Sequence, residues 1–183
     1  MSNPSMVIVL LEDDHHEMLI RRYLVNSGLK RHAMRIHRSP SGHGSAESWV
    51  LKRFAEETGE YRRRQARAGT ALIVMIDADT HSVQDRLTQL DQALKDSGIK
   101  TVGKSERIAR LVPRRNVETW ILCLNGEAVN EEIDYKGTRN DWSELIPRAA
   151  QTLCHSTRPQ AELPNQCVDS LRSGVQDLKR LAS

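Results

Sequence analysis

The chain has 183 residues with a formal net charge of +3 at pH 7, and 38% of its residues are hydrophobic and 28% charged. These values are typical of a globular protein with its own core, and no apolar run reaches the roughly 18 residues that a membrane-spanning helix needs. The N-terminus has no basic leader before its apolar run, so we expect a cytoplasmic protein with no secretory signal and no membrane contact. Three widely spaced cysteines predict neither a disulfide framework nor a zinc knuckle.

Four short apolar segments predict β-strands, and each is followed by a helical pattern. The expected strands cover residues 6–11, 34–37, 71–76 and 107–112, of which the last is shorter and more polar and therefore nearer an edge. The expected helices cover residues 15–26, 46 to a break at Gly59, 83 to a stop at Gly98, and 117–124. This alternation of strands and helices favours an α/β fold with a parallel sheet of about four strands and helices on both faces.

The pattern changes after Gly126. Residues 127–139 are polar and irregular, a further helix begins near Asp141 with a kink at Pro147, and residues 167–182 form a last amphipathic helix. We therefore divide the chain into an α/β domain over residues 1–126 and a C-terminal helical extension over residues 127–183 that packs on it. The apolar stripe of the last helix leaves contact with a second copy or a partner as the alternative.

Acidic residues stand at the expected carboxyl ends of several strands. Glu12 ends the first strand, Asp77 and Asp79 end the third, and Glu118 lies in the first turn of the helix after the fourth. Because parallel strands share this edge, we expect the four carboxylates to converge there. Carboxylate oxygens are the ligands that Mg²⁺ or Mn²⁺ prefers, and such ions stabilise the charge that develops in phosphoryl transfer. The sequence thus predicts a divalent-metal site, although each acid by itself is also explained as a helix N-terminal or loop residue.

The same segments resemble the TOPRIM superfamily of nucleases, topoisomerases and primases. The similarity lies in VIVLLE ending at Glu12, IVMIDAD ending at Asp79 and RIARLVPRRNVETWIL containing Glu118, and it covers roughly residues 6–126. It is greatest to the small stand-alone TOPRIM-like proteins of bacterial defence systems, of the OLD type. The chain departs from the family pattern because Asp13 stands where a glycine is usual and His16 where an acid is usual.

The resemblance implies a Rossmann-like TOPRIM sheet and cleavage of phosphodiester bonds in nucleic acid with Mg²⁺ or Mn²⁺. It also implies a role in antiphage defence or in a mobile-element system, often beside an ATPase of the ABC or AAA type. In the family, the residue matching Glu12 is a general acid/base, and those matching Asp77 and Asp79 hold the metal. We take Glu12 as a metal ligand as well, and Glu118 as a fourth catalytic acid.

Two alternatives stay open. A chain that has lost catalysis would be a regulatory or binding subunit of such a system. The segment LLEDDHHEMLIRRYL also resembles the start of a two-component receiver domain, in which paired acids among Glu12, Asp13 and Asp14 bind Mg²⁺ beside a phosphoacceptor, here Asp77. Lys104 is a poor match for the receiver's lysine, and Asp77 lies later in the chain than a compact receiver would place it.

Basic residues and histidines complete the candidates. Two arginine clusters predict contacts with a nucleic-acid backbone, with a solvated helix face and loop as the alternative. These arginines are Arg62, Arg63, Arg64, Arg67, Arg114 and Arg115. His43, His81 and Lys104 are accessory candidates for phosphate contact or proton transfer. His15 and His16 are adjacent, so they point in different directions on a helix and cannot form an i, i+4 zinc pair.

Overall fold

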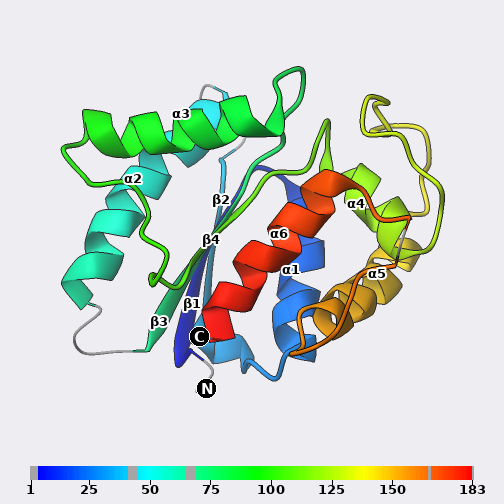
Figure 1. The fold of residues 1–183 in the computed structure, drawn as a ribbon, viewed down its shortest axis with the longest axis horizontal. Helices are drawn as coiled ribbons and strands as arrows, with labels where there is room; N and C mark the ends of the chain where they lie inside the picture. Colours follow the sequence, from blue (N-terminus) through cyan, green and yellow to red (C-terminus); the bar gives the residue numbers. More distant parts are fainter. Residues whose placement is uncertain (1–3, 41–44, 65–68, 165, 183) are drawn as a thin grey trace.

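The computed structural model describes residues 4–40, 45–64, 69–164 and 166–182, which form a parallel sheet with helices on both faces (Figure 1). The strands are β1 (Met6–Leu11), β2 (Met34–Arg38), β3 (Thr70–Met75) and β4 (Ile108–Leu111), in the order β2-β1-β3-β4. Every neighbouring pair is parallel. The predicted α/β class is confirmed, each strand agrees with its prediction to within one residue, and β4 lies at an edge as expected.

Alternation of side chains along the strands builds two hydrophobic cores. Val7, Val9 and Leu11 of β1 belong to one core, whereas Ile8 and Leu10 belong to the other, and all five are at most 2% exposed. The central strand β3 is buried along its whole length. A strand that is apolar on both faces is stable only when both faces are covered, so these apolar runs produce a sheet with helices on either side.

Two groups of helices cover the two faces (Figure 1). One face carries α2 (Ala46–Arg64) and α3 (Val83–Asp96). The other carries α1 (Asp14–Asn26), α4 (Val117–Leu124), α5 (Trp142–Ser156) and α6 (Asp169–Lys179). Two short 3₁₀ turns, η1 (Arg31–Ala33) and η2 (Arg180–Ala182), precede β2 and follow α6. None of the helices in the described ranges has both the length and the apolar character needed to cross a bilayer.

Gly59 does not break its helix, contrary to the prediction, because α2 continues through it to Arg64. Thr58 and Tyr61 on either side of Gly59 are buried, so the apolar face of the helix runs past the glycine. This packing outweighs the cost of about 1 kcal/mol that glycine carries inside a helix. At the start of α3, Ser82 and Asp85 form a capping box, in which each side chain accepts a hydrogen bond from the other's backbone N–H.

The last helix, α6, packs back onto β4 and α4. Trp120 Nε1 donates a hydrogen bond to Ser170 Oγ (2.7 Å), and Asp177 Oδ2 accepts one from the backbone N–H of Arg110 (3.0 Å). The backbone of α6 comes so close that a Cβ placed on Gly174 would overlap the indole ring of Trp120. The C-terminal helices therefore share a hydrophobic core with the sheet, while the division into two domains at residue 126 stays a prediction.

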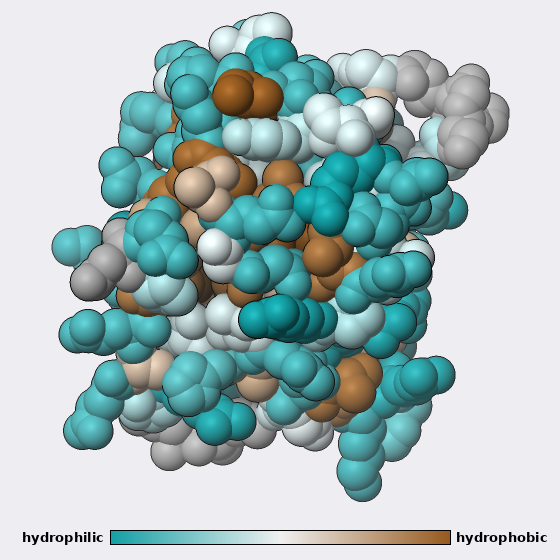
Figure 2. Space-filling view, turned by 90° about the vertical axis from the view of Figure 1, so that its right-hand side faces the viewer, coloured by the Kyte–Doolittle hydropathy of each residue, from teal (hydrophilic) through white to brown (hydrophobic). Residues whose placement is uncertain are grey.

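The apolar stripe that suggested a dimer is covered by the chain itself. Leu171, Val175 and Leu178 of α6 are at most 3% exposed. Figure 2 shows a largely hydrophilic face on the side where α5 and residues 127–141 lie, with apolar atoms in separate spots. Over the described ranges, Val25 and Ile133 are the exposed large hydrophobic side chains. The homodimer stays a prediction, and α6 is not a free surface for it.

We expect Gly174→Ala to destabilise the protein by about 1–3 kcal/mol, because the added methyl group overpacks the contact with Trp120. Gly59→Ala is the matched control, since its Cβ would lie 3.4 Å from Ile99 Cδ1, an ordinary contact, and alanine is the better helix former. Urea unfolding of both variants measures the difference. Equal stability of the two variants would contradict the close approach of α6 to Trp120.

Candidate metal site

The strand order creates a switch point between β1 and β3. The chain leaves β1 for β2 on one side and later returns to β3 on the other. Leu11 and Met75 end these two strands as paired neighbours. Glu12 follows β1 directly, and Asp77 follows β3 after one further residue, so both lie outside the carboxyl ends of adjacent strands. In open α/β sheets, the crevice at such a point is where ligands bind.

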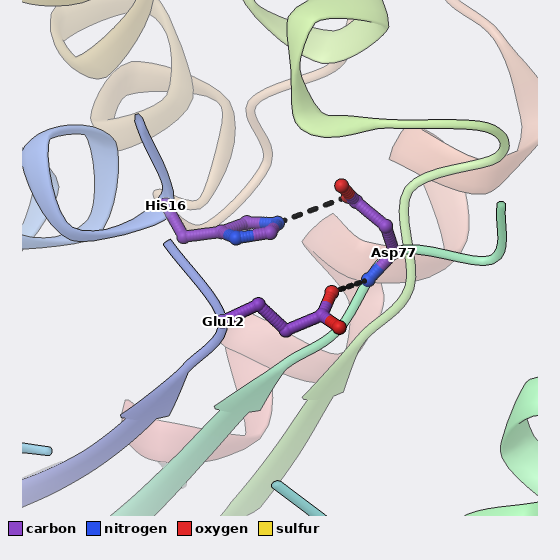
Figure 3. Close-up of side chains that lie close together, drawn as sticks. All are labelled: Glu12, His16 and Asp77. Atoms are coloured by element: carbon purple, nitrogen blue, oxygen red, sulfur yellow. Dashed lines mark hydrogen bonds and ion pairs between the residues drawn. The ribbon is translucent and has the colours of Figure 1, made fainter. Parts of the chain in front are cut away.

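Glu12, His16 and Asp77 meet in this crevice (Figure 3). Glu12 Oε2 accepts a hydrogen bond from the backbone N–H of Asp77 (2.6 Å), and His16 Nε2 lies 2.9 Å from Asp77 Oδ1. His16 comes from the first turn of α1, and its side chain is fully buried. One ligand atom from each of the three residues lies within 4.8 Å of the others. They form a compact group of two carboxylates and one imidazole.

Burial and mutual charge determine the protonation of this group. Burial raises the pKa of Glu12 from 4.5 to about 7, against the opposing charge of His16. Burial also raises the pKa of Asp77, again opposed by His16. Burial lowers the pKa of His16, but the charges and hydrogen bonds of Asp77 and Asp13 outweigh it and raise that pKa well above 6.5. With no bound cation, the imidazolium of His16 is therefore the positive charge that the carboxylates share.

Asp13 holds His16 from the other side. It is the N-cap of α1, and its Oδ1 accepts the backbone N–H of His16 (3.1 Å) and lies 3.1 Å from His16 Nδ1. Its Oδ2 lies 3.2 Å from Lys136 Nζ, which reaches in from the polar segment after α4. Although burial raises the pKa of Asp13, His16 and Lys136 hold it well below its ordinary value. The imidazole thus lies between two carboxylates, in hydrogen-bond contact with Asp77 at Nε2 and close to Asp13 at Nδ1, where no hydrogen bond forms.

Glu118 forms a second buried acid beside this group. It lies in the first turn of α4, is fully buried, and its Oε1 is 2.6 Å from His15 Nδ1. The ring of His15 packs beside Trp142, with centroids 5.9 Å apart. In the described part of the chain, Glu118 Oε2 is buried without a hydrogen-bond partner. Its charge contributes to the raised pKa of Asp77, so Glu118 adds negative potential to the crevice.

Asp79 lies at the rim rather than inside the cluster. Its side chain is 60% exposed, and its φ of 52° places it in the left-handed region that aspartate tolerates better than most residues. Its Oδ2 is 3.6 Å from Arg86 Nη2. Arg86 is fully buried, donates from Nε to the carbonyl oxygen of Asp77 (2.9 Å), and also pairs with Glu47. Arg86 therefore holds the turn that carries both aspartates.

The donor set fits a divalent cation. Glu12 and Asp77 are desolvated carboxylates whose ionised forms gain from a nearby positive charge. The unpartnered Oε2 of Glu118 adds a third buried oxygen with unused acceptor capacity, counted over the described residues. The structure brings the four predicted acids to one edge of the sheet, but the compact group is Glu12, His16 and Asp77.

The remaining predicted residues divide between the two edges of the sheet. Arg114, Arg115 and His81 lie at the edge of the acids, where Arg114 pairs with Glu132 (2.7 Å) and donates to the carbonyl oxygen of His81. Residues at the C-terminal end of α2 and in the loop before β4 lie at the opposite edge, and these are Arg62, Arg63, Arg64 and Lys104. His43 and Arg67 lie outside the described residues.

The arginines at the C-terminal end of α2 form ion pairs with acidic residues. Arg62 Nε is 2.6 Å from Glu106 Oε1, and Arg63 and Arg64 both pair with Glu60. Because acidic residues already neutralise these arginines, the cluster is explained as a charged helix surface, and no bound phosphate is needed to account for it. Its predicted contact with nucleic acid stays a prediction.

The sequence reasoning missed four residues of the site, namely His15, His16, Arg86 and Lys136. The two histidines were not predicted to belong to the site, whereas each faces a different acid. A signal was available for His16, because it stands four residues after Glu12, at a position where the TOPRIM pattern has an acid. Arg86 and Lys136 carry no local signal, since tertiary structure alone brings them to the aspartates.

Comparison with known proteins yields structural neighbours only. No protein-family model matches the chain, and no curated protein sequence matches it. The C-terminal region of the Burkholderia pseudomallei OLD protein is similar in structure at 13% identity and a TM-score of 0.41, covering 98% of this chain and 99% of that chain. The C-terminal region of the Xanthomonas campestris pv. campestris OLD protein is similar at 13% identity and a TM-score of 0.40, covering 97% and 94%. At this identity and TM-score, the similarity carries no functional conclusion.

We expect the metal-free protein to lose stability as the pH rises from about 5 to 8. A raised folded-state pKa means that Glu12 keeps a proton that the unfolded chain releases above pH 4.5, so ionisation costs stability up to about pH 7. The raised pKa of His16 acts in the same direction above pH 6.5. The shift of Glu12 alone corresponds to roughly 3 kcal/mol at 1.4 kcal/mol per unit.

Urea unfolding in EDTA across this pH range measures the effect. Glu12→Gln keeps an oxygen acceptor for the N–H of Asp77 and should flatten the pH dependence, whereas the exposed Glu162→Gln should leave it unchanged. An identical slope for wild type and Glu12→Gln would show that Glu12 is not held protonated in the fold.

Proposed function

We propose that the protein is a TOPRIM-like nuclease that cleaves phosphodiester bonds in nucleic acid with Mg²⁺ or Mn²⁺. The observation that carries the proposal is the compact group of Glu12, His16 and Asp77 at the switch point, with Glu118 Oε2 beside it, buried and without a hydrogen-bond partner among the described residues. Buried carboxylates in a ligand-binding crevice are costly unless a cation or a catalytic role accounts for them.

Each acid has a distinct part in this proposal. Glu12, Asp77 and the rim residue Asp79 would hold the metal, which when bound supplies positive charge to the phosphoryl oxygens and lowers the pKa of water. In the metal-free protein, burial raises the pKa of Glu12 to about 7. A bound cation would lower this pKa and make Glu12 the carboxylate that a metal ligand or a general base requires. Glu118 orients His15 through the 2.6 Å contact and contributes negative potential. Arg86 holds the backbone of Asp77 in place.

We expect Asp77→Asn and Glu12→Gln each to lower metal-dependent cleavage of nucleic acid by ~100-fold or more, because each removes a charged oxygen at the reacting centre. The assay presents single- and double-stranded DNA and RNA with Mg²⁺ or Mn²⁺. Asp96→Asn is the matched control, since Asp96 ends α3 at the other edge of the sheet. Metal-dependent cleavage that survives both site substitutions would end the nuclease assignment.

A groove beside α1 offers a path for the substrate. It has a volume of about 550 Å³, runs from the first turn of α1 towards its last turn, and borders α5. Among the charged residues that line it, Arg38 pairs with Asp14 and Glu17, whereas Arg22 and Arg31 are exposed and have no ion-pair partner in the described ranges. Two arginines without an acidic partner are available to neutralise phosphates, unlike the paired arginines of α2.

We expect the double variant Arg22→Ala/Arg31→Ala to weaken nucleic-acid binding and to lower the slope of log K against log salt by about 2, one for each lost phosphate contact. Fluorescence anisotropy in EDTA measures binding without cleavage. Arg63→Ala/Arg64→Ala removes the same charge at the opposite edge and should change the slope little. The reverse order of effects would move the nucleic-acid path to the arginines of α2, one of the two clusters that the sequence analysis predicts.

A second candidate function is a catalytically inactive regulatory subunit. The observation in its favour is the position of His16 between Asp77 Oδ1 (2.9 Å) and Asp13 Oδ1 (3.1 Å), where a protonated imidazole neutralises both carboxylates without a metal. Such a subunit would show no cleavage in Mn²⁺ and would copurify with an ABC- or AAA-type ATPase, the partner that the TOPRIM resemblance implies for a defence system.

The receiver alternative has less support. The Asp77 side chain is 5% exposed and is in contact with His16, and Lys104 lies at the opposite edge of the sheet. A receiver would be labelled at Asp77 by acetyl phosphate, whereas a nuclease would not.

A further inference from the structure

The compact group at the switch point includes a nitrogen donor, which an all-carboxylate site does not have. His16 Nε2 faces Asp77 Oδ1 at 2.9 Å, and a ligand atom of Glu12 completes the group within 4.8 Å. The imidazole is fully buried and comes from a helix, so its position is defined by packing rather than by a loop. Figure 3 shows the ring edge directed at Asp77, with the carboxylate of Glu12 next to it.

The opposite ring nitrogen lies beside a carboxylate, although the two atoms do not meet the geometry of a hydrogen bond. His16 Nδ1 lies 3.1 Å from Asp13 Oδ1, and the same oxygen accepts the backbone N–H of His16. A metal-ligating imidazole typically directs its second nitrogen at a carboxylate or carbonyl, which sets the tautomer and the orientation of the ring. Asp13 is in turn held by Lys136 Nζ at 3.2 Å. With Asp13 beside Nδ1, the nitrogen of His16 that would bind a metal in the crevice is Nε2.

A mixed set of this kind discriminates between metal ions. Mg²⁺ takes oxygen ligands almost exclusively, whereas imidazole is a good ligand for first-row transition metals, and their affinities rise from Mn²⁺ to Cu²⁺. The buried oxygen of Glu118 without a partner, judged within the described ranges, shows that acceptor capacity for a cation remains nearby.

We propose that His16 Nε2 is a metal ligand together with Glu12 and Asp77, and that the site therefore takes a divalent first-row transition metal in preference to Mg²⁺. The inference rests on the metal site of the proposed function and names its metal class. Replacement of His16 by aspartate gives an oxygen-only set and should shift the preference towards Mg²⁺.

The test uses the full-length protein and Mn²⁺ itself as the probe. Pulsed EPR of stoichiometric Mn²⁺ bound to the wild-type protein should show modulation from a coordinated imidazole nitrogen. The modulation should persist in His15→Gln, the neighbouring histidine on the same helix, and should be absent in His16→Asp. Calorimetric titration should give an affinity for Mn²⁺ that exceeds that for Mg²⁺ by ~10-fold or more in the wild type, with a smaller ratio in His16→Asp.

The outcomes separate this inference from the proposed nuclease. Mn²⁺ bound without nitrogen modulation in the wild type would overturn the role of His16, a result that needs no variant to fold. Cleavage with Mg²⁺ and Mn²⁺ alike, without nitrogen modulation, would leave the nuclease standing and remove the inference. Nitrogen modulation without cleavage of any nucleic acid would support His16 as a metal ligand and contradict the proposed nuclease. Failure to bind either metal would overturn the inference and identify His16 as a fixed counter-charge.

Discussion

The contact between His16 and Asp77 is the interaction on which the arrangement of the site depends. Asp77 is buried at the end of the central strand, where an ionised carboxylate without a counter-charge would be strongly unfavourable. His16 supplies that charge from α1, and Asp13 in turn supports His16. Arg86 and Lys136 bring further positive charge from α3 and from the segment after α4. Four separate parts of the chain are thus tied together at one crevice.

A proton and a metal ion compete for the imidazole of His16. An imidazolium at His16 neutralises the aspartates and stabilises the metal-free fold, whereas a metal needs the neutral imidazole as a ligand. The raised pKa of Glu12 belongs to this balance, because its proton is held only while no stronger cation is close. Activity, metal preference and the pH dependence of stability are therefore linked properties of one buried cluster, and a substitution at His16 should alter all three.

Strand positions and the location of the acids were predictable from sequence because their signals are local. Runs such as VIVLL and ALIVM are rich in β-branched residues and are buried on both faces, and an acid after such a run lies at the carboxyl edge of a parallel sheet. Gly59 shows where local signals fail, since burial of Thr58 and Tyr61 keeps the helix intact through a residue that disfavours it. Asp79 shows the same limit, because alternation along a strand ends where the chain turns into a left-handed residue.

The sequence by itself determined the α/β alternation, the parallel strands, the N-terminal capping of α3 and the edge at which Glu12, Asp77, Asp79 and Glu118 lie. Each of these follows from hydrophobic periodicity or from residues close together in the chain. Tertiary structure alone decided which charges meet. It paired Asp77 with His16 and Glu118 with His15. It also directed Asp79 towards Arg86, and it placed the arginines of α2 at the opposite edge of the sheet from the acids. The reason is that ionic contacts depend on distances of a few ångströms between residues up to 123 positions apart, which no local pattern encodes.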